Sequence, residues 1–128
     1  MRKNLVSILI TNYNKAKFLK KNIEHCLNQT YKNIEILVFD DSSTDTSHKI
    51  LKQFRNKKIS VIYNKKKKYN SGPLNQLYGI NNLFKKSKGK IIFLLDSDDF
   101  FLKKKVNYIL KLFENNKNLN FVQDTAFI

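Results

Sequence analysis

The sequence predicts an α/β fold with a doubly wound, mostly parallel sheet, and two observations support this prediction. Short runs of apolar residues alternate along the chain with longer segments in which apolar residues recur every three or four positions. The short runs are typical of strands buried on both faces, as in a parallel sheet, and the longer segments are typical of amphipathic helices. Strands and helices that alternate in this order form parallel sheets with helical crossovers.

Four mostly apolar runs, each of five or six residues, are predicted as strands. They are Leu5–Ile10, Ile34–Phe39, Ile59–Tyr63 and Ile91–Leu95. We also expect a last strand over Asn120–Ile128. Because the chain has no internal repeat, no low-complexity linker and one proline, residues 1–128 are interpreted as a single domain.

The first two helices are predicted from their apolar periodicity, and each has a candidate capping residue. Asn14 is the candidate N-cap of a helix that runs to about Asn28. Ser43 or Thr44 is expected to cap the second helix. The negative charge of Asp45 would be favourable near the positive N-terminal end of this helix.

Two further helices are predicted in the second half of the chain. Pro73 suits the first turn of the third helix, which should fade near Ser87. The fourth helix is expected over Leu102–Glu114, with its apolar residues on one face.

The composition is that of a globular protein in a reducing compartment. An apolar fraction of 41% makes disorder unexpected. A single cysteine, Cys26, excludes an internal disulfide, and no apolar run approaches the roughly 18 residues that span a bilayer. We therefore predict a cytoplasmic protein.

The net charge of +15 comes almost wholly from lysine. A field of this sign favours anionic partners such as nucleotides or acidic lipid surfaces. The charge thus leaves open a peripheral association with the inner face of a membrane.

Six of the ten acidic residues form two clusters, each placed directly after an apolar run. They are Asp40, Asp41 and Asp45 in the first cluster, and Asp96, Asp98 and Asp99 in the second. The carboxyl ends of parallel strands meet at one edge of the sheet, where open α/β folds bind ligands. Neighbouring carboxylates repel one another unless a cation or a hydrogen-bonding ligand relieves them. The two clusters therefore predict a site for a metal ion and an oxygen-rich ligand.

Four sequence blocks, in order and at matching spacing, resemble family 2 glycosyltransferases, which have the GT-A fold. The blocks are Val6–Asn14; Gln29–Tyr31 with Glu35–Asp41 and Ser43–Asp45; Asn70–Gly72; and Gly89–Asp99, which ends in an Asp-x-Asp motif. The resemblance covers nearly the whole chain.

This resemblance implies a metal-dependent enzyme that transfers a sugar from a nucleotide-diphosphate donor to an acceptor. From the family, we expect a UDP-sugar as donor and a saccharide or lipid-linked molecule as acceptor. We also expect transfer with inversion, in bacterial surface polysaccharide or glycan synthesis. Mn²⁺ or Mg²⁺ would bridge the diphosphate oxygens and stabilise the departing group.

The resemblance also implies roles for the second acidic cluster. Asp98 would be the direct metal ligand, and Asp96 would lie nearer the ribose or the waters of the metal. Asp99 would support the donor sugar or the loop, so Asp98 and Asp99 are the catalytic candidates.

The nucleotide-binding residues are implied in the same way. Asp41 would accept a hydrogen bond from the nucleobase imide, while Asp40 would shape the loop. Thr11, Asn12 and Tyr13 would line the base and ribose pocket, and Tyr13 would offer a flat face for stacking.

Two departures from the family pattern bear on function. Many relatives carry an Arg-Asn pair in the helix after the glycine, but Pro73–Gly79 has no arginine, so Lys68 or Asn75 would have to contact the diphosphate. Relatives also continue past the equivalent of Ile128 into an acceptor-binding half that holds the catalytic base. We therefore expect this chain to be the nucleotide-sugar-binding part, truncated before that half, and to be inactive or slow alone.

Two other functional classes remain open from the residues. A phospho-receiver domain is also doubly wound and binds Mg²⁺, but it needs an acidic pair after the first strand, where this chain has Thr11 and Asn12. The second class is a basic nucleic-acid-binding module. This chain has no recognisable nucleic-acid-binding motif, and its carboxylate clusters would repel phosphate, so no nucleic-acid partner is expected. His25, Cys26 and His48 are interpreted as structural residues.

Overall fold

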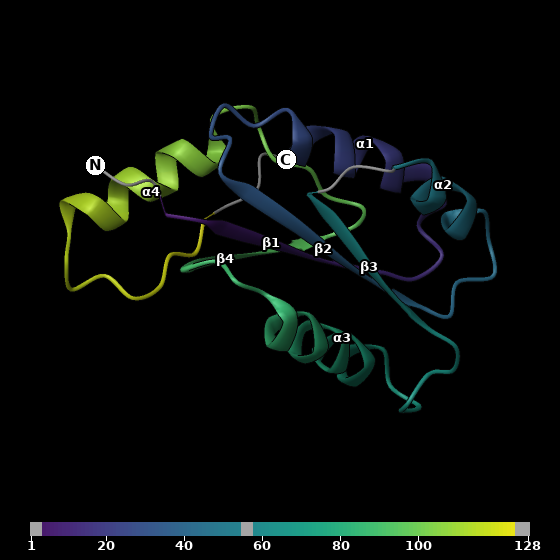
Figure 1. Ribbon diagram of the computed structural model, residues 1–128. Coiled ribbons are helices and arrows are strands. Elements are labelled where there is room, and N and C mark those ends of the chain that lie inside the picture. The colour runs from purple at the N-terminus through teal and green to yellow at the C-terminus, as the bar shows by residue number, and fades with distance from the viewer. Residues whose placement is uncertain (1–3, 55–57, 125–128) are drawn as a thin grey trace.

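The computed structural model describes residues 4–54 and 58–124. Within these ranges strands and helices alternate from β1 to α4 (Figure 1). The elements are β1 (Val6–Asn12), α1 (Ala16–Leu27), β2 (Ile34–Asp41), α2 (Ser47–Gln53), β3 (Ile59–Asn64), α3 (Gly72–Lys86), β4 (Ile91–Asp96) and α4 (Lys105–Asn115). The predicted α/β class and the four predicted central strands are thus confirmed.

The four strands form one sheet in the order β3-β2-β1-β4, and all neighbouring pairs are parallel. Helices α1, α2 and α4 cover one face of the sheet, and α3 covers the other (Figure 1). The chain order reverses beside β1, which pairs with β2 on one side and with β4 on the other. Such a switch point is where doubly wound sheets bind their ligands.

The sheet separates two hydrophobic cores. Alternate residues of each strand point to opposite faces, so the larger core beneath α1, α2 and α4 receives Val6, Ile8 and Ile10, all 0% exposed. The smaller core beneath α3 contains Leu9, Leu37, Phe39 and Leu83. Burial on both faces explains why the strands read as continuous apolar runs.

The strands extend beyond their predicted apolar runs into polar residues. The parallel ladder continues through the pairs Thr11 with Asp96 and Asn12 with Asp40. The backbone hydrogen bonds of a ladder do not depend on the apolar character of the side chain. The polar residues at the carboxyl edge are therefore held by the sheet itself.

The predicted caps of the first two helices are wrong. Asn14 has a positive φ of 51° and its side-chain oxygen accepts hydrogen bonds from the backbone N–H groups of Thr44 and Asp45. The α1 helix follows N-cap Lys15, and the α2 helix follows N-cap Thr46. Asp45 lies beside the start of α2 as predicted.

The third helix agrees with its prediction, whereas the last two predicted elements differ. Ser71 caps α3 and Pro73 lies in its first turn. The fourth helix begins at Lys105, because the preceding residues from Leu102 form a turn. The predicted strand Asn120–Ile128 is wrong over residues 120–124, which pair with none of the described strands, and residues 125–128 lie outside the described part.

Two glycines allow segments to approach the sheet closely. A Cβ atom on Gly79 would lie 2.7 Å from Cδ1 of Phe39, so glycine lets α3 pack against β2. A Cβ atom on Gly89 would lie 2.5 Å from the backbone N of Ser7 and 2.9 Å from the carbonyl carbon of Val6. Gly79 thus sets the distance of α3 itself from the sheet, and Gly89 sets the position of the segment between α3 and β4.

Candidate nucleotide-sugar and metal site

A cavity of about 240 Å³ lies at the carboxyl ends of the strands. Seven residues that the sequence predicted for the site line this cavity: Thr11, Asn12, Tyr13, Asp41, Asn75, Asp96 and Asp98. The two predicted residues Asp40 and Asp99 are not among its lining residues. The structure thus brings both acidic clusters to one cavity.

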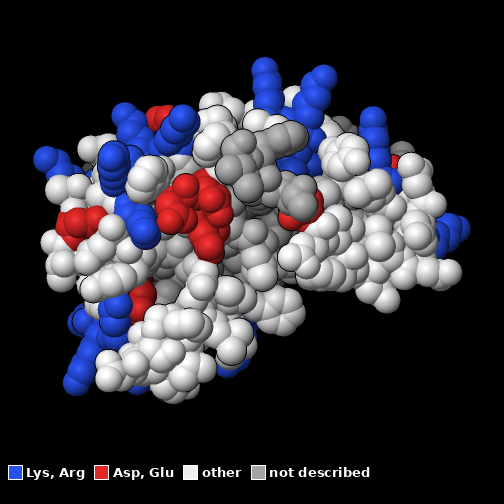
Figure 2. Space-filling model, turned by 180° about the vertical axis from the view of Figure 1, so that it is seen from behind, with Lys and Arg blue, Asp and Glu red and all other residues white. Residues whose placement is uncertain are grey.

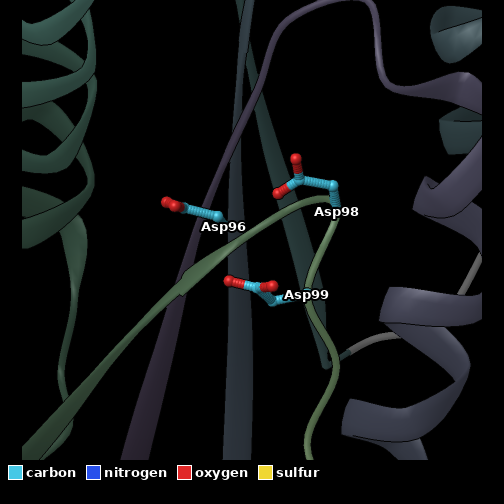
Figure 3. Close-up of side chains that lie close together, drawn as sticks. All are labelled: Asp96, Asp98 and Asp99. Atoms are coloured by element: carbon cyan, nitrogen blue, oxygen red, sulfur yellow. The ribbon is translucent and has the colours of Figure 1, made fainter. Parts of the chain in front are cut away.

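The second acidic cluster surrounds the turn that follows β4 (Figure 3). One carboxylate oxygen from each of Asp96, Asp98 and Asp99 lies within 4.8 Å of the others, and all three residues are exposed. The buried Asn22 fixes the turn, because its side-chain amide donates to the backbone oxygens of Asp96 at 2.9 Å and Asp99 at 2.7 Å. The α1 helix, which lies on the other face of the sheet from α3 (Figure 1), therefore helps to position the cluster.

The cluster carries negative charge that its surroundings only partly relieve. Burial and the charges of Asp99 and Asp98 raise the pKa of Asp96, although a hydrogen bond of 2.5 Å from Gln76 acts in the opposite direction. The ammonium group of Lys15 lies 3.4 Å from a carboxylate oxygen of Asp98. A basic side chain thus already occupies a position where positive charge is favourable.

These residues fit a divalent cation of the hard type. Mg²⁺ and Mn²⁺ prefer carboxylate oxygens, and ligand oxygens on opposite sides of Mg²⁺ stand about 4 Å apart. The three oxygens lie within 4.8 Å of one another, so a small closing movement of the side chains would bring them to that spacing. A bound cation would relieve the repulsion that raises the pKa of Asp96.

Charge is unevenly distributed over the surface as well. Figure 2 shows a larger group of acidic side chains and several smaller ones, with lysine side chains spread among them. On a chain of net charge +15, this arrangement offers a cation an acidic site and offers an anion basic surroundings.

Asp41 and Asp40 have different environments at the end of β2. Asp41 lines the cavity, and one of its carboxylate oxygens accepts a hydrogen bond of 2.8 Å from the side-chain amide of Asn64. Asp40 is 0% exposed and accepts hydrogen bonds from Asn12, Ser43 and His48. Asp40 can therefore influence a ligand only through the residues around it.

The basic residues that line the cavity are Lys15 and Lys67, and not the predicted Lys68. The ammonium group of Lys67 lies 3.1 Å from the ring centroid of Tyr13, and both residues line the cavity. Lys68 instead lies over the rings of Tyr69 and Tyr78, and it is absent from the cavity lining.

Asn75 lines the cavity, but its amide is already engaged. The side-chain oxygen accepts from the backbone N–H of Tyr69, and the side-chain nitrogen donates to the backbone oxygen of Tyr69, both at 2.8 Å. Asn75 thereby ties the loop before α3 to the helix.

Two of the three residues interpreted as structural lie away from the cavity. Cys26 is buried in the larger core, and burial raises the pKa of its thiol to about 12. A ring nitrogen of His25 lies 3.1 Å from the backbone oxygen of Phe101. His48 differs, because it contacts Asp40 beside the site.

Four residues near the site were missed in the sequence: Lys15, Asn64, Lys67 and Gln76. Asn64 ends β3 and could have been found by the strand-end rule that identified Asp41. The side chains of Lys15, Lys67 and Gln76 come from loops or from a helix, where the strand pattern gives no signal.

The parallel order, the helices on both faces and the acidic turn after β4 define an α/β fold of the GT-A type. Residues 7–127 match the family Glycosyl transferase family 2. The chain therefore belongs to this family, which is incompatible with the receiver-domain and nucleic-acid-binding alternatives.

A curated relative and two solved structures agree with this assignment. The Escherichia coli UDP-Glc:alpha-D-GlcNAc-diphosphoundecaprenol beta-1,3-glucosyltransferase WfaP is 37% identical over 113 residues, which are 88% of this chain and 43% of that protein. S. aureus TarS matches with a TM-score of 0.77 and 22% identity over 93% of this chain and 38% of that one. A Pyrobaculum calidifontis mannosyltransferase in complex with GDP-Man and Mn²⁺ matches with a TM-score of 0.64 and 17% identity, over 75% and 28% of the two chains.

TarS has also been solved with UDP and with UDP-GlcNAc. At these identities the structural likeness shows the shared fold. The chain spans less than half the length of the curated relative and of both solved structures. Among the residues that the structure describes, none of the helices has the length and apolar character needed to cross a membrane.

Proposed function

We propose that this chain is the nucleotide-sugar-binding part of a metal-dependent, inverting glycosyltransferase. The donor is a UDP-sugar, and the acceptor is a saccharide or a lipid-linked saccharide in bacterial surface polysaccharide or glycan synthesis. The observation that supports this proposal best is that Asp41 and Asp98 line the same cavity, at the sheet's switch point. One end suits a nucleobase and the other suits a metal-bound diphosphate.

The relatives support the choice of ligands. The E. coli relative is named for a UDP-Glc donor and a diphosphoundecaprenol acceptor. TarS binds UDP and UDP-GlcNAc, and the archaeal mannosyltransferase binds Mn²⁺ together with its donor.

The acidic turn holds the metal ion in this proposal. Asp98 is the direct ligand, Asp96 contributes a ligand or orients the metal's waters, and Asp99 supports the donor sugar or the turn. Mn²⁺ or Mg²⁺ would supply Lewis-acid stabilisation of the departing diphosphate. Gln76, which donates to Asp96, orients that carboxylate towards the cavity side.

The opposite end of the cavity takes the nucleoside. Asp41 accepts a hydrogen bond from the base, and Thr11 and Tyr13 contact the base or the ribose. The side-chain oxygen of Asn12 is buried and has no hydrogen-bond partner among the described residues. Because an unpaired buried acceptor is unfavourable, a donor group of the ligand or a water molecule would stabilise it.

Lysines replace the arginine that many relatives use at the diphosphate. Lys67 lines the cavity beside Tyr13, and Lys15 lies against Asp98. Both can move their flexible side chains to a phosphate oxygen, whereas Asn75 positions the loop through Tyr69. The cytoplasmic location and the contact with the inner face of a membrane remain predictions from the sequence.

Calorimetry with UDP, in Mn²⁺ and after chelation, tests the proposal. We expect binding that depends on the metal, because carboxylates and diphosphate repel each other without a bridging cation. Asp98→Ala should abolish the metal-dependent part, whereas Asp41→Ala should weaken the nucleoside contact and leave the metal dependence intact. Glu24→Ala, an exposed carboxylate on α1 outside the cavity, is the matched control. Equal affinity for UDP with and without metal would contradict the assigned role of Asp98.

A further inference from the structure

Asp40 is a buried carboxylate that does not line the cavity but accepts hydrogen bonds from residues around it. Asp40 is 0% exposed and receives four hydrogen bonds: from the Asn12 amide at 2.8 Å, the Ser43 hydroxyl at 2.8 Å, the Ser43 backbone N–H at 3.1 Å and the His48 ring at 2.7 Å. A buried carboxylate requires such donors, because its desolvation is otherwise strongly unfavourable.

His48 differs from the other donors in its origin. Asn12 and Ser43 belong to the strand end and loop at the site, whereas His48 lies on α2. A carboxylate only accepts hydrogen bonds when ionised, so the Nε2 atom of His48 is the donor. The edge of the ring packs against Tyr63, with 4.9 Å between the ring centroids.

The contacts of Asp40 connect His48 to the cavity. Asp40 pairs across the sheet with Asn12 on one side and with Tyr63 on the other. It orients the side-chain amide of Asn12, a residue that lines the cavity, and it precedes Asp41 in the same strand. Any shift of the Asp40 carboxylate would therefore move two residues that contact the nucleoside in the proposed function.

We propose that His48 is a positioning residue of the nucleotide site, which acts through Asp40 on Asn12 and Asp41. This inference rests on the proposed function for the identity of the ligand. His48 itself does not line the cavity, so it has no contact with the bound nucleotide.

Three substitutions separate the hydrogen bond of His48 from its packing. His48→Gln keeps an N–H donor at about the distance of Nε2, His48→Asn has a shorter side chain, and His48→Ala has no donor. All three lose the ring contact with Tyr63, so only the donor distinguishes them. Gln53→Ala, an exposed residue of the same helix, is the control for changes to α2.

Calorimetry with UDP and Mn²⁺ measures the effect. We expect about tenfold weaker binding for His48→Ala and His48→Asn, within the usual range of coupling between sites. His48→Gln and Gln53→Ala should bind like the wild type. Equal affinity of His48→Ala and wild type, or equal losses in His48→Gln and His48→Ala, would overturn the inference.

An NMR measurement distinguishes failure of this inference from failure of the proposed function. The side-chain amide signal of Asn12 and the backbone amide signal of Asp41 should shift in His48→Ala without ligand and return in His48→Gln. If the wild type binds no UDP, the proposed donor is wrong, and these signals still decide the role of His48. Unshifted signals in His48→Ala would refute the positioning role.

Discussion

Asp40 and Asp41 are adjacent in the sequence but serve the site from opposite faces of the sheet. Successive residues of a strand point to opposite faces, and Val38 belongs to the core beneath α1 and α2 whereas Phe39 belongs to the core beneath α3. Asp40 therefore meets His48 on α2, and Asp41 points to the α3 side, where the cavity lies. This alternation explains why Asp40 is buried among protein donors while its neighbour Asp41 lines the cavity.

Cys26 gives a pH-dependent stability that can be measured at the residue scale. Burial raises the pKa of its thiol from 9.0 to about 12. The folded state therefore retains this proton between pH 9 and pH 12, while the unfolded state loses it. Because the unfolded state then binds fewer protons, the free energy of unfolding falls as pH rises, by up to about 1.4 kcal/mol per pH unit from this group.

Denaturant unfolding of the wild type and Cys26→Ala above pH 9 measures this contribution. All other groups are the same in both proteins, so only the difference between the two curves reports on Cys26. We expect the stability advantage of the wild type to shrink as pH rises. Parallel curves for the two proteins would show that the thiol ionises alike in both states.

At the scale of elements, a single carboxylate serves the starts of two helices. One oxygen of Asp45 accepts from the backbone N–H of Ala16 at the start of α1, and the other accepts from that of Ser47 at the start of α2. The sequence predicted both helices from their apolar periodicity, but it assigned their caps to Asn14 and to Ser43 or Thr44. Local rules cannot identify a cap that comes from a loop 29 residues away.

Replacing Asp45 should destabilise both helices. Loss of a capping side chain typically lowers the free energy of unfolding by about 1 kcal/mol, and two helix starts share this one. Although burial opposes it, hydrogen bonds from Ser47 and the backbone of Ala16 lower the pKa of Asp45. A carboxyl with a lowered pKa stabilises the fold above its unfolded pKa and loses this effect as pH falls.

Thermal and denaturant unfolding of Asp45→Ala at neutral and acidic pH tests this prediction. The difference from the wild type should be about 1 to 2 kcal/mol at neutral pH and should diminish towards low pH. Thr46→Ala, an exposed neighbour whose side chain makes no capping hydrogen bond, serves as the control. A difference that stays constant down to low pH would contradict the ionic part of the argument.

At the scale of the whole molecule, the sequence predicted the sheet edge but not all of its surroundings. The apolar runs identified the strands, and the acidic residues after them identified Asp41 and Asp96, because a strand fixes the position of the residue at its end. Thr11 and Asn12 were identified through the family resemblance. The contributions of Lys67, Gln76 and His48 depend on how the loop before α3, α3 itself and α2 pack against the sheet. Such contacts are long-range and leave no periodic signal in the sequence.

The positions of all ten acidic residues lead to a prediction about activity. Six lie in the two clusters at the carboxyl edge, where they line the cavity or lie beside the residues that line it. Of the other four, Glu35 accepts from Ser7 at the opposite end of the sheet, and Asp124 pairs with Lys105 on α4. Glu24 and Glu114 lie on α1 and α4 and do not line the cavity. The chain thus offers no further carboxylate at the cavity to serve as the base.

We therefore expect these 128 residues to bind UDP with Mn²⁺ but to transfer sugar slowly or not at all. Binding needs the strand ends and the acidic turn, whereas transfer also needs an aligned acceptor and a base, which alone contributes roughly 10²–10⁴ in rate. The measurement is release of UDP from a UDP-sugar, with and without an added saccharide acceptor. Slow release without acceptor agrees with the prediction, because water reaches an uncovered donor. Efficient acceptor-dependent transfer that Asp99→Asn abolishes would instead identify a base within the acidic turn and show the prediction to be wrong.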